Sequence, residues 1–180
     1  MAAVSSLSVR RENWVTAWAA ENPDKVSGLA GIYPVFDFRT YPGLANAAPA
    51  YGLTPAEPES KLSEHNPIER VGALAKAKVP VLFIHGDEDK VVPLKENSAE
   101  FVARYKAAGA GDLATLIVPK GQGHNYWQGF FRCQELIDFT IKRAKSGSTP
   151  ATSGPDAPSG APVTRASTRW TMFSAMSCSP

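Results

Sequence analysis

The sequence contains neither a long apolar run nor a large excess of charge of one sign. No apolar stretch among its 180 residues approaches the roughly 18 residues that a membrane span needs. The net charge of +2 argues against the strongly basic surface typical of nucleic-acid-binding proteins. The first arginines follow the small residues at the N-terminus, which is not the order of a secretory signal. We therefore expect no membrane and no nucleic acid as partners, and the compartment stays open.

Cysteines and ligand-binding motifs are also scarce. Cys133 falls in an expected helix and Cys178 near the C-terminus, so we predict one buried and one exposed thiol without a disulfide framework. No segment has G-x-G-x-x-G or Walker spacing, so a nucleotide site has no support. A metal cluster can be drawn from two histidines and two aspartates, but no H-x-x-x-H spacing links them, and neither a metal nor a cofactor is expected. The four are His85, Asp87, Asp89 and His124.

The stretch that organises the chain is VPVLFIHGDEDKVVP, residues 79–93. Residues 81–84 are an apolar run between a proline and a glycine, which is typical of a strand buried on both faces of a parallel sheet. Three carboxylates, Asp87, Glu88 and Asp89, follow at the carboxyl end of this strand. In open α/β sheets that edge is where sites are built.

A second strand-and-loop unit follows the first. Residues 113–118 form another apolar run, and His124 stands in the glycine-flanked loop GQGHN directly after it. An acid after one parallel strand and a histidine after the next would meet at one edge of the sheet. This is the acid and base half of a Ser-His-Asp system.

The rest of the chain predicts an α/β fold in which helices flank a parallel sheet. Hydrophobic residues make up 43% of the chain and charged residues 20%, which is ordinary for a globular domain with its own core. We expect one further strand over residues 26–35. Helices are expected over residues 14–20, 68–78, 93–108 and 134–145, on the periodicity of their apolar positions and the prolines and glycines that bound them.

HGDEDKVVP followed by GQGHN resembles the C-terminal half of an α/β-hydrolase, from the serine esterase and prolyl-oligopeptidase-like branch. The motif G-x-x-D-x-x-V-P places the family's acid on Asp89, and G-x-G-H places its base on His124. The resemblance covers roughly residues 14–144. It implies a serine hydrolase that cleaves a small-molecule carboxylic ester, or in second place a peptide bond, through an acyl-enzyme and without a cofactor.

The nucleophile of this family precedes the acid and the base in the chain and sits in a G-x-S-x-G elbow. Ser8 is the nearest serine to that place, but its neighbours in SLSVR include neither glycine. The elbow glycines relieve a strained turn, so we expect an N-terminally truncated or mis-started domain. Two hypotheses stay open: a serine hydrolase with Ser8 as nucleophile, and a non-catalytic remnant or binding module that lacks the elbow.

The other acids and histidines have weaker claims on these roles. We expect Asp87 to cap its loop by accepting backbone N–H groups and Glu88 to face solvent. His65 lies at a helix-to-loop break and lacks the strand-end setting of His124.

The chain divides by composition into a domain, residues 1–145, and a tail, residues 146–180, rich in serine, threonine, proline and glycine. We predict that the tail is disordered, because it has too few large apolar residues to offset its ordering entropy. Within the domain, residues 36–70 read as an irregular loop whose aromatics either line a pocket or pack the loop onto the body. They are Phe36, Phe38, Tyr41 and Tyr51, with Tyr33 just before them.

Overall fold

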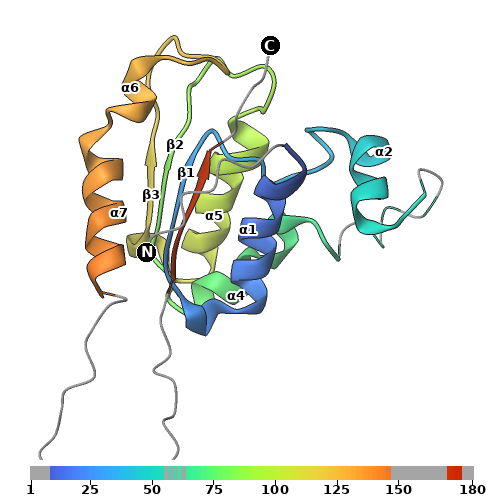
Figure 1. Cartoon of the computed structure of the whole chain (residues 1–180), viewed down its shortest axis with the longest axis horizontal. Helices are drawn as coiled ribbons and strands as arrows, with labels where there is room; N and C mark the ends of the chain where they lie inside the picture. Colours follow the sequence, from blue (N-terminus) through green and yellow to red (C-terminus); the bar gives the residue numbers. More distant parts are fainter. Residues whose placement is uncertain are drawn as a thin grey trace, which may run out of the picture.

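The computed structural model of the chain describes residues 9–54, 57, 59, 61, 64–146 and 170–175, with 9–14 and 170–175 described through their backbone alone. Its centre is a four-stranded parallel sheet with strand order β3-β2-β1-β4 (Figure 1). The predicted α/β fold, a parallel sheet flanked by helices, is confirmed. The strands are β1 (Val26–Ile32), β2 (Val81–Ile84), β3 (Ala114–Ile117) and β4 (Trp170–Ala175).

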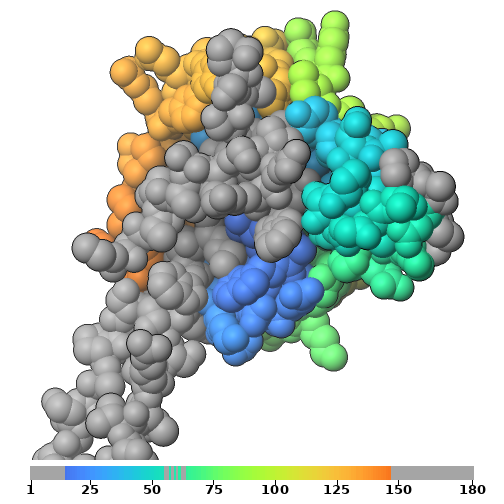
Figure 2. Space-filling view, turned by 45° about the vertical axis from the view of Figure 1, so that its right-hand side comes forward, coloured from blue at the N-terminus to red at the C-terminus, as the bar shows by residue number. Residues whose placement is uncertain are grey.

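Helices lie on both faces of the sheet (Figure 1). On one face are α1, α4 and α5, and on the other is α7. The segment with α2 and η2 forms a lobe at one side of the body (Figure 2). The α-helices are α1 (Val9–Glu21), α2 (Leu44–Ala47), α4 (Val71–Lys76), α5 (Glu100–Ala107), α6 (Gln128–Phe131) and α7 (Gln134–Ser146). Short 3₁₀ turns are η1 (Pro23–Lys25), η2 (Ala48–Tyr51), η3 (Pro67–Arg70) and η5 (Gly111–Leu113), and η4 (Lys95–Ala99) is a π-helical turn.

Strand β2 has two apolar faces because its side chains alternate between two cores. Val81 and Phe83 of β2 belong to the core beneath α1, α4 and α5, whereas Leu82 and Ile84 belong to the core on the side of α7. All four side chains of β2 are buried. This explains why the run VLFI is continuously apolar instead of alternating with polar residues.

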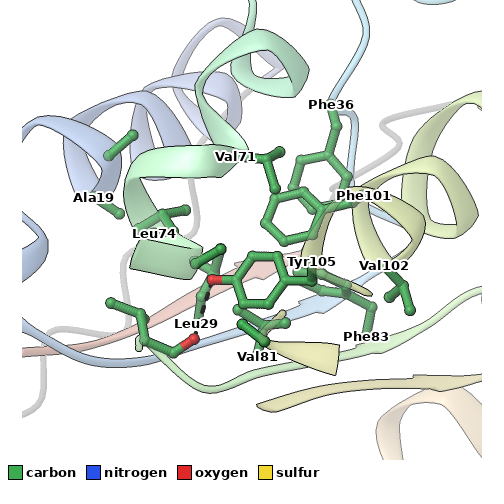
Figure 3. Packing of buried hydrophobic residues seen from close by; sticks show 14 of the residues in the cluster. Ala19, Leu29, Phe36, Val71, Leu74, Val81, Phe83, Phe101, Val102 and Tyr105 are labelled. Carbon is green, nitrogen blue, oxygen red and sulfur yellow. Dashed lines mark hydrogen bonds between the residues drawn. The ribbon is translucent and has the colours of Figure 1, made fainter. Parts of the chain in front are cut away.

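The first core is built around stacked aromatic rings (Figure 3). Phe101 of α5 lies between Phe36 and Tyr105, with ring centroids 4.4 Å and 5.2 Å away. The buried Tyr105 hydroxyl donates to the carbonyl of Val79, 3.0 Å away, so its polar end is satisfied as well. Helix α5 is thereby fixed to the segment that leads into β2.

Two buried asparagines hold the loop after β1. Asn97 accepts the N–H groups of Phe36 and Asp37 at 2.8 and 2.9 Å, and its amide donates to Thr40 and to the Pro93 carbonyl. Asn66 accepts the N–H of Phe38 at 3.1 Å. Buried backbone N–H groups need hydrogen-bond partners, and an irregular loop has no neighbouring strand to supply them. The two asparagine side chains supply them here.

The C-terminal region differs from the predicted disordered tail at Trp170–Ala175. These six residues form β4, which pairs in parallel with β1, so that Ile32 lies opposite Ala175. The prediction of disorder was based on the composition of the whole tail, whereas the short run WTMFSA within it has residues suited to a strand. Residues 147–169 and 176–180, with Cys178, lie outside the described residues.

Two smaller predictions can be compared with the described part of the chain. Cys133 is a buried free thiol, as expected. Among the described helices, none combines the length and the apolar character that crossing a membrane requires.

Removing β4 tests whether it stabilises the sheet. A chain that ends at Arg169 is expected to lose about 2 kcal/mol of unfolding free energy, the cost of uncovering one or two buried side chains. It should also self-associate, since the edge of β1 is then open to another strand. Urea unfolding and light scattering measure both effects, with a chain ending at Ala175 as the control. Equal stability of the two truncated chains would show that β4 contributes nothing.

Candidate active site

The candidate site lies where β1, β2 and β3 end. The strands are parallel, so their carboxyl ends share one edge of the sheet. Tyr33 follows β1, Asp89 lies in the turn after β2, and His124 lies in the loop after β3. The structure therefore brings together the acid and the histidine that the sequence singled out.

The backbone of the turn after Asp89 holds the Asp89 carboxylate in the interior. Its Oδ1 accepts the N–H groups of Val91 and Val92 at 2.9 and 2.8 Å. Its Oδ2 lies 2.8 Å from Nδ1 of His124 and 3.3 Å from Nε2 of His85. The carboxylate is fully buried, and its four donors replace the water that burial removes.

These donors keep Asp89 ionised. Burial alone would raise the pKa of Asp89, but hydrogen bonds from His124, His85 and the Val92 N–H outweigh it and hold the pKa well below the usual range. An ionised carboxylate only accepts hydrogen bonds, so the proton in the contact with His124 is on Nδ1.

In the neutral imidazole of His124 the free lone pair is therefore on Nε2. Its side chain is 2% exposed, and Nε2 is buried without a hydrogen-bond partner among the described residues. The ring of Tyr33 packs against the imidazole with centroids 4.3 Å apart. A buried lone pair without a donor is costly, and it is what a histidine needs to accept a proton from a hydroxyl.

A glycine allows the two loops to meet. A Cβ at Gly86 would lie 2.1 Å from the carbonyl oxygen of Gln122, which is a clash. Any other residue type at this position would therefore force the two loops to shift. The N–H of Glu88 donates to that same carbonyl at 2.9 Å. The loop that carries His124 is thus seated directly on the turn that carries Asp89.

The remaining candidates fall where the sequence placed them. Asp87 accepts the N–H of Gly121 at 2.7 Å and so caps the loop, and Glu88 is exposed; both expectations are confirmed. His65 stacks on Tyr51, with ring centroids 4.9 Å apart, in a different part of the chain. Phe36 and Phe38 are buried in the two cores, which favours packing over pocket lining for both.

Two predictions about the site remain predictions. Ser8 and the expected elbow lie outside the described residues. The expectation that no metal binds also stays a prediction; among the described residues Asp87 turns to Gly121, and no group of side chains that could hold a metal ion is found.

Two residues of the site were missed by sequence reasoning. Tyr33 was considered only as a loop aromatic, yet it has a left-handed φ of 36° at the end of β1 and lies on the His124 ring. His85 was considered only as a metal ligand, yet it contacts Asp89. The available signal in the sequence was a histidine directly after a strand expected to be buried on both faces, since a ring buried there needs polar partners.

Residues 14–141 match the prolyl oligopeptidase family. The chain belongs to this family. The family lies within the α/β-hydrolases, so the resemblance read from HGDEDKVVP and GQGHN is confirmed. A similar solved structure is described as a dipeptidyl aminopeptidase IV from Bacteroides ovatus, with 24% identity and a TM-score of 0.54.

That similarity concerns the fold. It covers 74% of this chain and 18% of the Bacteroides protein, so the present chain spans a small part of the length of that relative. No curated protein matches the chain.

Substituting Gly86 tests the contact between the two loops. Gly86→Ala should lower the free energy of unfolding by about 3 kcal/mol, as when atoms are forced into a packed site. Gly72→Ala is the matched control, because a Cβ there meets nothing within 4 Å in an exposed turn of α4. It should raise stability by about 0.5–1 kcal/mol. Equal effects in urea unfolding would contradict the close approach.

The depressed pKa of Asp89 predicts a pH dependence of stability. A carboxyl whose folded pKa is lowered contributes stability above its unfolded pKa, about 4, and loses it as the pH falls further. The gap in unfolding free energy between the wild type and Asp89→Asn should therefore be largest near pH 7 and shrink below about pH 4. Urea unfolding from pH 7 to pH 3 measures it, with Asp87→Asn as control. A gap that is constant with pH would refute the ionised, hydrogen-bonded state.

Proposed function

We propose that this chain carries the acid and base of a serine hydrolase of the prolyl oligopeptidase family. The observation that carries the proposal is the state of His124: Nδ1 is bound to Asp89 at 2.8 Å, and Nε2 is buried without a described partner. This is the arrangement by which a base removes a proton from a serine hydroxyl.

The chemistry that follows is acyl transfer. His124 Nε2 takes the hydroxyl proton as serine Oγ bonds to the substrate carbonyl carbon, and Asp89 stabilises the imidazolium. Nε2 then gives the proton to the leaving group as the bond from the carbonyl carbon to that group breaks. Water repeats the sequence on the acyl-enzyme. No electrons are exchanged with an outside carrier.

Ser8 is the proposed nucleophile. It directly precedes α1 in the chain, and α1 runs antiparallel to β1, so this helix begins toward the edge where β1 ends (Figure 1). This supports Ser8 by position in the chain, and the missing glycines make it the part of the proposal that most needs a test.

The bond that is cleaved follows from the family more than from the site. Acyl transfer by this pair serves esters and peptides equally. Membership of the prolyl oligopeptidase family favours a peptide bond, although the resemblance seen in the sequence implied an ester first and a peptide bond second. Paired assays with a nitrophenyl ester and a peptide anilide separate the two.

Labelling with a fluorophosphonate probe tests the function directly. We expect one serine to be labelled, at Ser8, and His124→Ala to reduce the labelling rate and any turnover by about 10⁴-fold or more. His65→Ala is the control, because His65 stacks on Tyr51 far along the chain from the pair. It should leave both readouts unchanged. Peptide mapping by mass spectrometry identifies the labelled residue.

Two results would decide against the proposal. Labelling that survives in His124→Ala would remove the histidine from the mechanism. Absence of labelling in folded wild-type protein would favour the second hypothesis, a non-catalytic binding module that keeps the acid and histidine without a working elbow.

A further inference from the structure

His85 is a buried histidine that the proposed chemistry does not use. It follows β2 and is fully buried, yet both ring nitrogens are bonded. Nδ1 lies 2.8 Å from the Ser98 hydroxyl oxygen, and Nε2 lies 2.9 Å from the Val92 carbonyl oxygen. A carbonyl only accepts, so Nε2 carries the hydrogen and Nδ1 accepts the hydroxyl proton of Ser98. The Val92 carbonyl thus fixes the tautomer of His85, and the Ser98 hydroxyl satisfies the other ring nitrogen.

The same Nε2–H also faces Asp89. It lies 3.3 Å from Oδ2, the oxygen that accepts from His124 Nδ1 at 2.8 Å. One N–H is therefore shared between the Val92 carbonyl and the acid. Asp89 Oδ1 accepts the N–H of Val92, so the turn already joins these two residues. The His85 ring contacts both of them again, through the Val92 carbonyl and Asp89 Oδ2.

We propose that His85 is a positioning residue that, with its tautomer fixed by the Val92 carbonyl and its ring held by Ser98, keeps Asp89 Oδ2 in line with His124. The inference rests on the proposed function, in which the Asp89 and His124 pair activates the nucleophile. A second donor on Oδ2 also takes up part of the negative charge. Without it, Asp89 binds the imidazolium of His124 more strongly and the proton is harder to remove.

The polar and titratable groups around the pair come from η4 and from the loops after β1, β2 and β3. Asp87 in the same turn binds the Gly121 N–H, Glu88 and Lys90 are exposed, and η4 contributes only the Ser98 hydroxyl. Asp89 and His124 contact each other, and two further side chains contact the pair: His85, after β2, lies against Asp89, and the Tyr33 ring, after β1, lies against His124.

The test compares His85→Leu with His85→Gln. Leucine fills the space but has no donor, whereas glutamine places an amide N–H near the position of Nε2. In His85→Leu we expect kcat to fall by about tenfold with KM little changed, as for other partners that orient a functional group from behind. The acidic limb of the kcat/KM–pH profile should move to higher pH. His85→Gln should restore both.

A spectroscopic readout separates this inference from the proposed function. The low-field proton resonance of the His124 Nδ1–H bond, identified by its loss in His124→Ala, should shift in His85→Leu and return in His85→Gln. If wild-type protein shows this pattern without turnover, the proposed function fails and the positioning role stands. If turnover is present and neither the resonance nor the acidic limb moves in His85→Leu, the positioning role fails.

Ser98→Ala keeps the test decisive if the His85 variants do not fold. Losing the hydroxyl leaves His85 Nδ1 without its buried partner and loosens the ring, so we expect a smaller shift of the acidic limb in the same direction. Thr16→Ala, which removes a buried hydroxyl from α1, is the control and should leave the limb in place. A profile for Ser98→Ala that matches Thr16→Ala would overturn the proposal.

Discussion

The hydrogen bond between Asp89 and His124 is the interaction on which the site depends, and it joins loops from two strands that are distant in sequence. A buried carboxylate costs several kcal/mol of free energy unless donors surround it. The fold supplies them through two backbone N–H groups and two imidazoles. The parallel sheet sets the strand ends side by side, and Gly86 removes the atoms that would hold the loops apart.

The architecture around the pair restricts its movement. Asn97 binds both the loop after β1 and the carbonyl of Pro93, which closes the motif that begins at Gly86. The loop that leads from Tyr33 and the turn that holds Asp89 are therefore tied to one buried amide. Tyr33 in turn contacts both His124 and Phe130. His124 is thus held both by the ring of Tyr33 and by the hydrogen bond to Asp89.

Much of the fold could be predicted from local patterns. Residues 81–84 form a strand with two apolar faces, as the continuous run indicated. Asp89 and His124 were recognisable because each follows a strand with glycines where the backbone turns. The strand expected over residues 26–35 ends at Ile32, because Tyr33 adopts a left-handed φ that no strand permits. The helix expected over residues 93–108 opens with a π-helical turn, where buried Asn97 and Ser98 serve the loops.

Other features depend on contacts that a linear pattern does not contain. A six-residue run in a polar tail gives no sign of which strand it will pair with, so β4 was not foreseen. His85 reads as the polar end of a strand until Ser98 and Asp89, which lie farther along the chain, are brought against it.

The protonation of His124 tests the account most directly. In protein labelled with ¹⁵N at histidine, the chemical shifts of the two ring nitrogens report which one carries the hydrogen. The structure predicts that in the neutral imidazole Nδ1 carries the hydrogen and Nε2 does not, and that Asp89→Asn abolishes this preference. A protonated Nε2 with a bare Nδ1 in the wild type would contradict the pairing with Asp89 and, with it, the role of His124 as a base.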